Sequence, residues 1–117
     1  MPNFPNVPSD ENGNILRRMF ENGDDLTKAR MIDFYFVFSQ RSMAIAFAAA
    51  LEDQALMICI SYYEKRAMWE VTVKRHMIPG HQEISTMEHS LTATAISFGG
   101  EADGWGCMQV DRSKEPE

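Results

Sequence analysis

The segment MIDFYFVF, residues 31–38, has the most regular two-residue alternation of aromatic and β-branched side chains in the chain. Because successive side chains of a β-strand point to opposite faces of the sheet, this period predicts a strand. Both faces are largely apolar, which predicts a sheet interior with neighbouring strands on each side and cover above and below. One face would carry Ile32, Phe34, Phe36 and Phe38, and the other Met31, Asp33, Tyr35 and Val37.

Composition indicates one folded domain. The chain has 117 residues, of which 44% are hydrophobic and 24% charged, values typical of globular proteins. Its net charge of −6 disfavours direct nucleic-acid binding, which needs a cationic surface, and favours a basic protein partner. The N-terminus lacks a signal-peptide pattern and no apolar run approaches the roughly 20 residues that span a bilayer, so we expect a cytoplasmic protein without membrane contact.

Residues 1–23 are predicted to form an arm followed by a helix. Three prolines within residues 1–8 predict an extended arm. A helix is expected from Asp10 to Asn22, with Ser9 or Asp10 as its cap and Gly23 as its left-handed stop.

Two further helices are predicted from apolar side chains at helical spacing. The first should be capped by Ser39, and the second should hold Pro79 in its first turn and end at Gly99-Gly100. Their buried stripes would be Met43, Phe47, Ala50 and Leu51 in one helix, and Ile84, Met87, Leu91, Ala95 and Phe98 in the other.

Three more strands complete the pattern. Leu56–Tyr63 and Met68–His76 are expected to form a hairpin through residues 64–67. The dipeptide Asp103-Gly104 should turn the chain into a last strand, Trp105–Val110.

Without the first helix, the predicted order is β-α-β-β-α-β. This is the ferredoxin-like α+β pattern, in which two helices cover one face of a four-stranded antiparallel sheet. The first and third strands would be interior and the second and fourth would be edges. The two cysteines, Cys59 and Cys107, would then lie on opposite edges, too far apart for a disulfide. The domain would span residues 9–110 and leave a charged, frayed tail, residues 111–117.

No catalytic residue, metal ligand set or cofactor motif is predicted. The histidines and cysteines have no zinc-binding spacing, and no nucleophile or phosphate-binding motif occurs. Carboxylates beside predicted turns and strand starts are expected to bond local backbone amides. Asp33 differs because it lies in an apolar strand and needs a partner. The turn and strand carboxylates are Asp24, Asp25, Asp33 and Asp103, and the candidate partners of Asp33 are Arg30, Lys74 and Arg75.

Charged residues mark two regions. Lys65, Arg66, Lys74 and Arg75 cluster near the predicted hairpin, where cations protect a sheet edge against unwanted pairing. An acidic region around the first helix favours contact with a basic partner, and an ordinary solvated helix with capping carboxylates is the alternative interpretation. Its members are Asp10, Glu11, Glu21, Asp24 and Asp25.

Several short motifs, taken in order, make residues 10–107 resemble the ribonuclease E inhibitor B (RraB-like) family. They are DENG at residues 10–13, LRRM at 16–19, GDDL at 23–26, RMIDF at 30–34, WEVTV at 69–73, HMIP at 76–79, GG at 99–100 and DGWG at 103–106. The resemblance implies a ferredoxin-like, non-catalytic protein that binds the endoribonuclease ribonuclease E and reduces RNA cleavage. The motif residues to which it assigns structural roles are Gly23, Asp33, Trp69, Pro79, Asp103, Gly104, Trp105 and Gly106, with Trp105 as an anchor and Gly23 and Gly104 in turns.

Two other readings stay open at this point. Ferredoxin-like domains also serve as small-molecule sensors, which commonly pair as homodimers with the ligand between them. An enzyme is the third reading, and no nucleophile, metal set or acid/base pair supports it.

Overall fold

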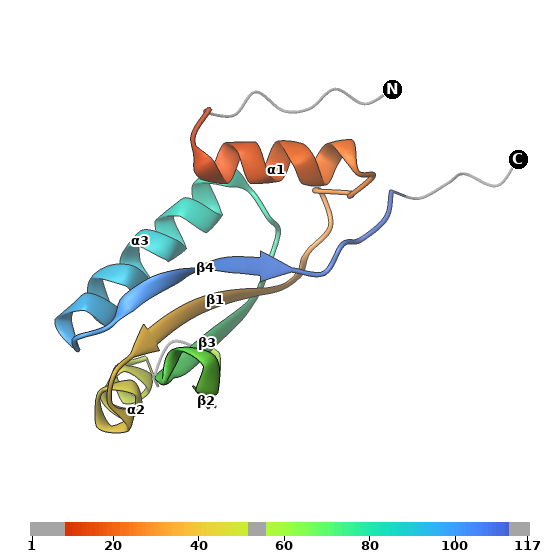
Figure 1. The fold of residues 1–117 in the computed structure, drawn as a ribbon. Helices are drawn as coiled ribbons and strands as arrows, with labels where there is room; N and C mark the ends of the chain where they lie inside the picture. Colours follow the sequence, from red (N-terminus) through yellow and green to blue (C-terminus); the bar gives the residue numbers. More distant parts are fainter. Residues whose placement is uncertain (1–8, 52–55, 113–117) are drawn as a thin grey trace, which may run out of the picture.

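The computed structural model describes residues 9–51 and 56–112, and Figure 1 shows their arrangement. After a first helix, the elements follow the predicted β-α-β-β-α-β order, so the ferredoxin-like α+β layout is confirmed. The elements are α1 (Glu11–Glu21), β1 (Arg30–Phe38), α2 (Arg41–Ala50), β2 (Met57–Tyr63), the short 3₁₀ helix η1 (Glu64–Arg66), β3 (Met68–Met77), α3 (His81–Ser97) and β4 (Glu101–Cys107).

The four strands form one antiparallel sheet in the order β2-β3-β1-β4. β1 and β3 are therefore interior and β2 and β4 are edges, as predicted. In the middle of the sheet, Phe34 of β1 lies between Val73 of β3 and Trp105 of β4.

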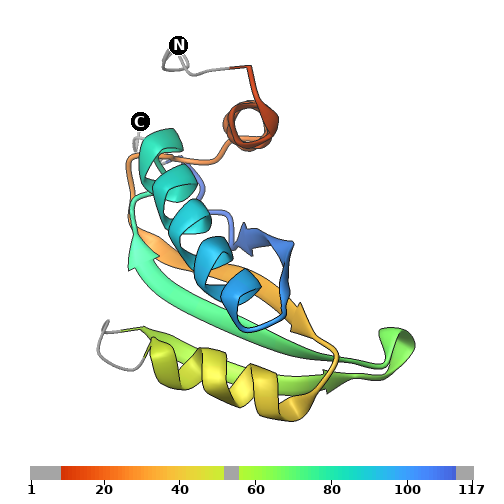
Figure 2. The ribbon, with the colours of Figure 1, turned by 90° about the vertical axis from the view of Figure 1, so that its left-hand side faces the viewer.

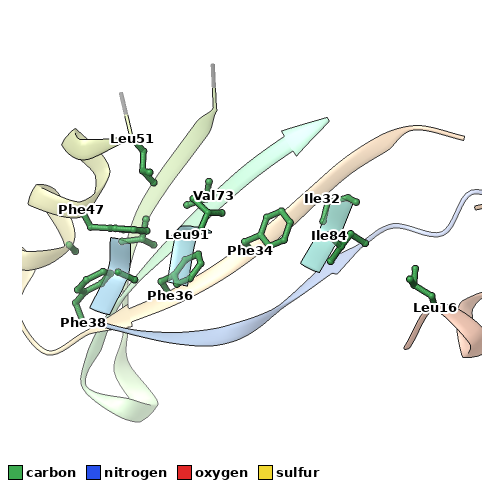
Figure 3. Packing of buried hydrophobic residues seen from close by; sticks show 13 residues of the cluster. Leu16, Ile32, Phe34, Phe36, Phe38, Phe47, Leu51, Val73, Ile84 and Leu91 are labelled. Atoms are coloured by element: carbon green, nitrogen blue, oxygen red, sulfur yellow. The ribbon is translucent and has the colours of Figure 1, made fainter. Parts of the chain in front are cut away.

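Helices α2 and α3 cover the same face of the sheet (Figure 2). Between them and the sheet lies the core, in which the Phe47 ring of α2 packs against the rings of Phe36 and Phe38 at centroid distances of 5.3 and 5.2 Å. Figure 3 shows these side chains together with others of the cluster. The fully buried large side chains are Leu16, Ile32, Phe34, Phe36, Val37, Phe38, Phe47, Leu51, Val71, Val73, Ile84 and Leu91.

No helix or strand of the described residues covers the opposite face of the sheet, so the predicted cover on both faces of β1 is wrong. On that face Met31 is 37% exposed, Asp33 and Tyr35 are half-buried, and Val37 alone among the four is buried. Right-handed β-α-β connections place both helices on one side of the sheet, which leaves the other side to solvent.

The ends of α1 agree with the prediction. The Asp10 carboxylate accepts a hydrogen bond from the Gly13 N–H at 2.8 Å and caps the helix. Gly23 follows the last turn with φ +94°, a left-handed conformation that favours glycine.

The starts of the other two helices differ from the prediction. Gln40, still extended at φ −128° and ψ 141°, is the N-cap of α2, so Ser39 lies one residue too early to cap it. α3 begins at His81 after the N-cap Gly80. Pro79 is therefore a buried residue before the helix and not part of its first turn.

β4 begins earlier and ends earlier than predicted. The chain pairs with β1 from Glu101 onward, so Asp103-Gly104 lies inside the strand and makes no turn. Phe34 pairs with Trp105 and Phe36 with Ala102, so three steps along β4 face two along β1. Gly104, at φ +96°, absorbs this extra residue as a β-bulge.

The predicted arm and most of the predicted tail lie outside what the structure describes. The predicted arm, residues 1–8, and tail residues 113–117 lie outside the described ranges. The first two tail residues are not frayed. Asp111 forms a β-bridge with Asp24, and the Arg112 guanidinium donates to the Phe20 carbonyl at 2.9 Å.

Candidate protein-binding surface

A polar network holds α1 against the rest of the domain. The Trp105 indole N–H donates to the Asn12 side-chain oxygen at 2.9 Å. The Asn12 amide nitrogen donates in turn to Ser85 Oγ at 3.2 Å and Glu88 Oε1 at 3.1 Å. One asparagine thus joins α1, β4 and α3. Because the Trp105 ring is also packed against the hydrophobic core, the structure supports the expected anchoring position of this residue.

A second contact links the start of α1 to the start of α3. His81 Nε2 lies 2.9 Å from both carboxylate oxygens of Asp10. The Gly13 N–H, and then His81, lower the pKa of the Asp10 carboxyl below its usual value. Asp10 is consequently ionised at neutral pH, and it serves the fold as well as adding negative charge to the surface.

The loop after α1 buries another carboxylate. Asp24 is 1% exposed, and both its oxygens lie 2.8 Å from Arg30 Nη1. The Arg30 guanidinium also donates to the carbonyls of Asp25 at 2.7 Å and Met108 at 3.1 Å. Asp24 therefore neutralises an internal guanidinium, and the expectation that it forms part of an exposed acidic surface does not hold.

Asp25 shapes the same loop. Its Oδ1 accepts hydrogen bonds from the Thr27 N–H at 3.1 Å and from Thr27 Oγ at 2.6 Å. These bonds lower the pKa of the half-buried carboxyl. The prediction that turn carboxylates bond local backbone amides is confirmed at this residue.

On the open face, Asp33 has the predicted cationic partner. Lys74 Nζ lies 3.3 Å from its carboxylate, and the Tyr35 hydroxyl donates to it at 3.4 Å. Burial, followed by the nearby Asp33 charge, raises the pKa of Tyr35. On the helix-covered face, Trp69 packs against Tyr62 at a centroid distance of 5.1 Å.

The start of α1 and the adjacent side of α3 form a groove. The groove has a volume of about 230 Å³, and Asp10, Glu11 and Glu88 place three carboxylates along it, together with His81 and His89. We call this feature the acidic groove. It contains Asp10 and Glu11 of the predicted acidic region, and it adds Glu88, which the sequence interpretation missed.

Glu21 does not belong to the groove. It lies ten positions from Glu11 along α1, which corresponds to roughly 15 Å at the helical rise. The sequence contained a signal for Glu88, because His81, Ser85 and Glu88 recur at the spacing of one helix face. What it could not show is that this face of α3 meets α1.

The described residues contain no group of three or more His, Cys, Asp or Glu side chains arranged to hold a metal ion. Cys59 and Cys107 are free and lie on opposite edge strands, as predicted. Burial raises the pKa of the Cys107 thiol. Among the described helices, none is long and apolar enough to cross a membrane.

These observations define a small α+β domain of ferredoxin-like topology with an additional N-terminal helix, α1. This helix forms the acidic groove together with α3. The family model described as RraB, Regulator of ribonuclease activity B, matches residues 9–107. The chain therefore belongs to the RraB family, as its motifs indicated. A comparison with curated proteins finds no match.

Proposed function

We propose that this protein regulates a ribonuclease by binding to it and catalyses no reaction itself. The observation that carries the proposal is the family match, which extends from residue 9 to residue 107 and so includes every element from α1 to β4. Ribonuclease E is the target that the sequence resemblance implies. The net charge of −6 favours a basic segment of that enzyme as the contact.

The acidic groove is the proposed contact surface. α1 lies outside the β-α-β-β-α-β unit, and the bonds of Asn12 and Asp10 hold it in a defined position. The carboxylates of Glu11 and Glu88 are therefore presented from a fixed frame, with Glu21 farther along the same helix. A field of one sign on a fixed surface accelerates association with an oppositely charged partner.

The experiment combines RNA cleavage by purified ribonuclease E with direct binding to its basic non-catalytic segment. The groove variant is Glu11→Gln/Glu88→Gln, since a glutamine at position 88 keeps the oxygen that accepts from Asn12. The matched control is Glu64→Gln/Glu101→Gln, which removes the same charge from the hairpin and β4. We expect the unmodified protein to slow cleavage. The groove variant should associate more slowly at low salt, and its difference from the control should shrink as salt rises.

Two results would contradict the proposal. If the unmodified protein neither binds the nuclease nor changes the cleavage rate at low salt, the regulatory function does not apply to this chain. If both double variants slow association equally, the protein binds through its overall charge and the groove is not the contact surface.

A further inference from the structure

The sequence of the edge strand β2 lacks the features that usually prevent an edge from pairing with another strand. Its sequence, MICISYY, contains no charged residue, proline or glycine. All seven residues, Met57–Tyr63, pair with β3 in unbroken register. Within residues 9–51 and 56–112, no strand pairs with the other side of β2. This sheet edge is about 24 Å long at the usual rise. A regular, uncharged edge of this length is a template for another strand.

Exposed apolar side chains concentrate on the same strand. Nine large hydrophobic residues are exposed among those that the structure describes, and four of them belong to β2. α2 packs beside β2 (Figure 2). It adds the exposed side chain of Ile45. The four residues on the strand are Met57, Ile60, Tyr62 and Tyr63.

The nearby cations do not protect this edge, contrary to the sequence expectation. Arg66 reaches β4, where its guanidinium lies 3.0 Å from Asp103 and 3.8 Å from Glu101. Lys74 pairs with Asp33 on β1. The other two cations of that group, Lys65 and Arg75, lie in η1 and β3 respectively, and not on β2.

We propose that β2 pairs antiparallel with β2 of a second copy of this chain, around a two-fold axis at Ile60. Ile60 is the middle residue of the strand, so this register gives every strand residue a partner. Ile58 would face Tyr62, and Ile60 would face its own counterpart. A two-fold axis perpendicular to the sheet keeps the helix-covered faces of both copies on one side, producing a continuous eight-stranded sheet.

Charge favours β2 over the other surfaces of the molecule as the contact between two copies. Each copy carries a net charge of −6, so most surfaces would bring like charges together on self-association. Along β2 there is no charge to repel, and the strand's apolar side chains meet their own kind. The pairing is a property of the isolated chain and does not rest on the proposed regulation of a nuclease.

The test is the mass of the purified chain in solution, measured by light scattering after size-exclusion chromatography. We expect twice the 13.3 kDa of one chain. Ile60→Lys should give a monomer, because it places two ammonium groups directly opposite each other at the axis. The control Ile96→Lys changes an exposed isoleucine of α3 and should remain dimeric. Mixing Ile60→Lys with Ile60→Glu should restore the dimer.

A measurement without substitution covers the case in which a variant folds poorly. Hydrogen exchange of β2 backbone amides in the unmodified protein should slow as protein concentration rises, while that of β4 amides should not. An unmodified protein that stays monomeric at its highest soluble concentration would overturn the proposal and leave the edge to a foreign segment. A dimer that persists in Ile60→Lys would overturn it as well, by placing the interface elsewhere.

Discussion

The two edges of the sheet are built in opposite ways. β4 carries the charges of Glu101 and Asp103 and a bulge at Gly104. Arg66 from the β2–β3 hairpin pairs with both acidic side chains. β2 is uncharged and regular. Charges and bulges are devices that prevent edge-to-edge pairing, so the sheet closes one edge and leaves the other available.

The edges also differ in their connections. β4 is joined to α1 through Trp105 and Asn12, and the segment after it is held by the Arg30 bond to the Met108 carbonyl. β2 pairs with β3 and packs beside α2. Substitutions around β4 should therefore reduce the stability of the monomer. Substitutions of exposed side chains on β2 should instead alter association.

The largest loss of stability is expected for Asp24→Ala, which would loosen the segment that follows β4. It leaves the buried Arg30 guanidinium without its counter-charge, and breaking a buried pair in this way costs about 3–5 kcal/mol. Urea denaturation would measure the free energy of unfolding. The control Asp111→Ala removes an exposed carboxylate from the same region and should cost far less. Equal effects would show that the carbonyl bonds of Arg30 suffice to hold this region.

A somewhat smaller loss is expected for Trp105→Ala, which removes a half-buried ring from the core and its bond to Asn12. We expect about 3 kcal/mol, at the low end for aromatic truncations. Trp105→Phe keeps most of the ring and should cost roughly 1 kcal/mol for the lost hydrogen bond. A Trp105→Ala variant of full stability that no longer bound its partner would instead place this residue in the interface.

Gly104→Ala tests whether the β4 bulge depends on glycine. Nothing lies within 4 Å of an added Cβ, so the cost would come from the backbone at φ +96° alone, about 1–2 kcal/mol. Gly106→Ala is the matched control in the same strand, because its Cβ would make only ordinary contacts with Tyr35. In thermal unfolding, Gly104→Ala should have a clearly lower melting temperature than the control. Identical melting temperatures would mean that the bulge tolerates a side chain.

The smallest effect is expected for Arg66→Ala. Its ion pairs with Asp103 and Glu101 are exposed, and exposed pairs contribute at most about 1 kcal/mol. The mass in solution should stay unchanged, since the substitution leaves β2 intact. A change of oligomeric state would show that Arg66 also affects pairing at the edge, and that the two edges are not independent.

What the sequence by itself determined was the set of local patterns and their order. Alternation in residues 31–38 predicted β1, and its apolar character correctly placed the strand in the interior. The cap at Asp10 and the stop at Gly23 were correct because capping depends on residues within one helical turn. The ferredoxin-like topology followed from element order alone.

Only the tertiary structure decided the features that join distant segments. The bulge at Gly104 depends on the register with β1, and the same dipeptide in isolation indicates a turn. The sequence pattern predicted Asp24 as a surface carboxylate, but the fold places it beside Arg30. Glu88 joined Asp10 and Glu11 only when α3 met α1. Local propensity cannot supply this information, since burial, edge exposure and the grouping of charges depend on which segments the sheet and helices bring together.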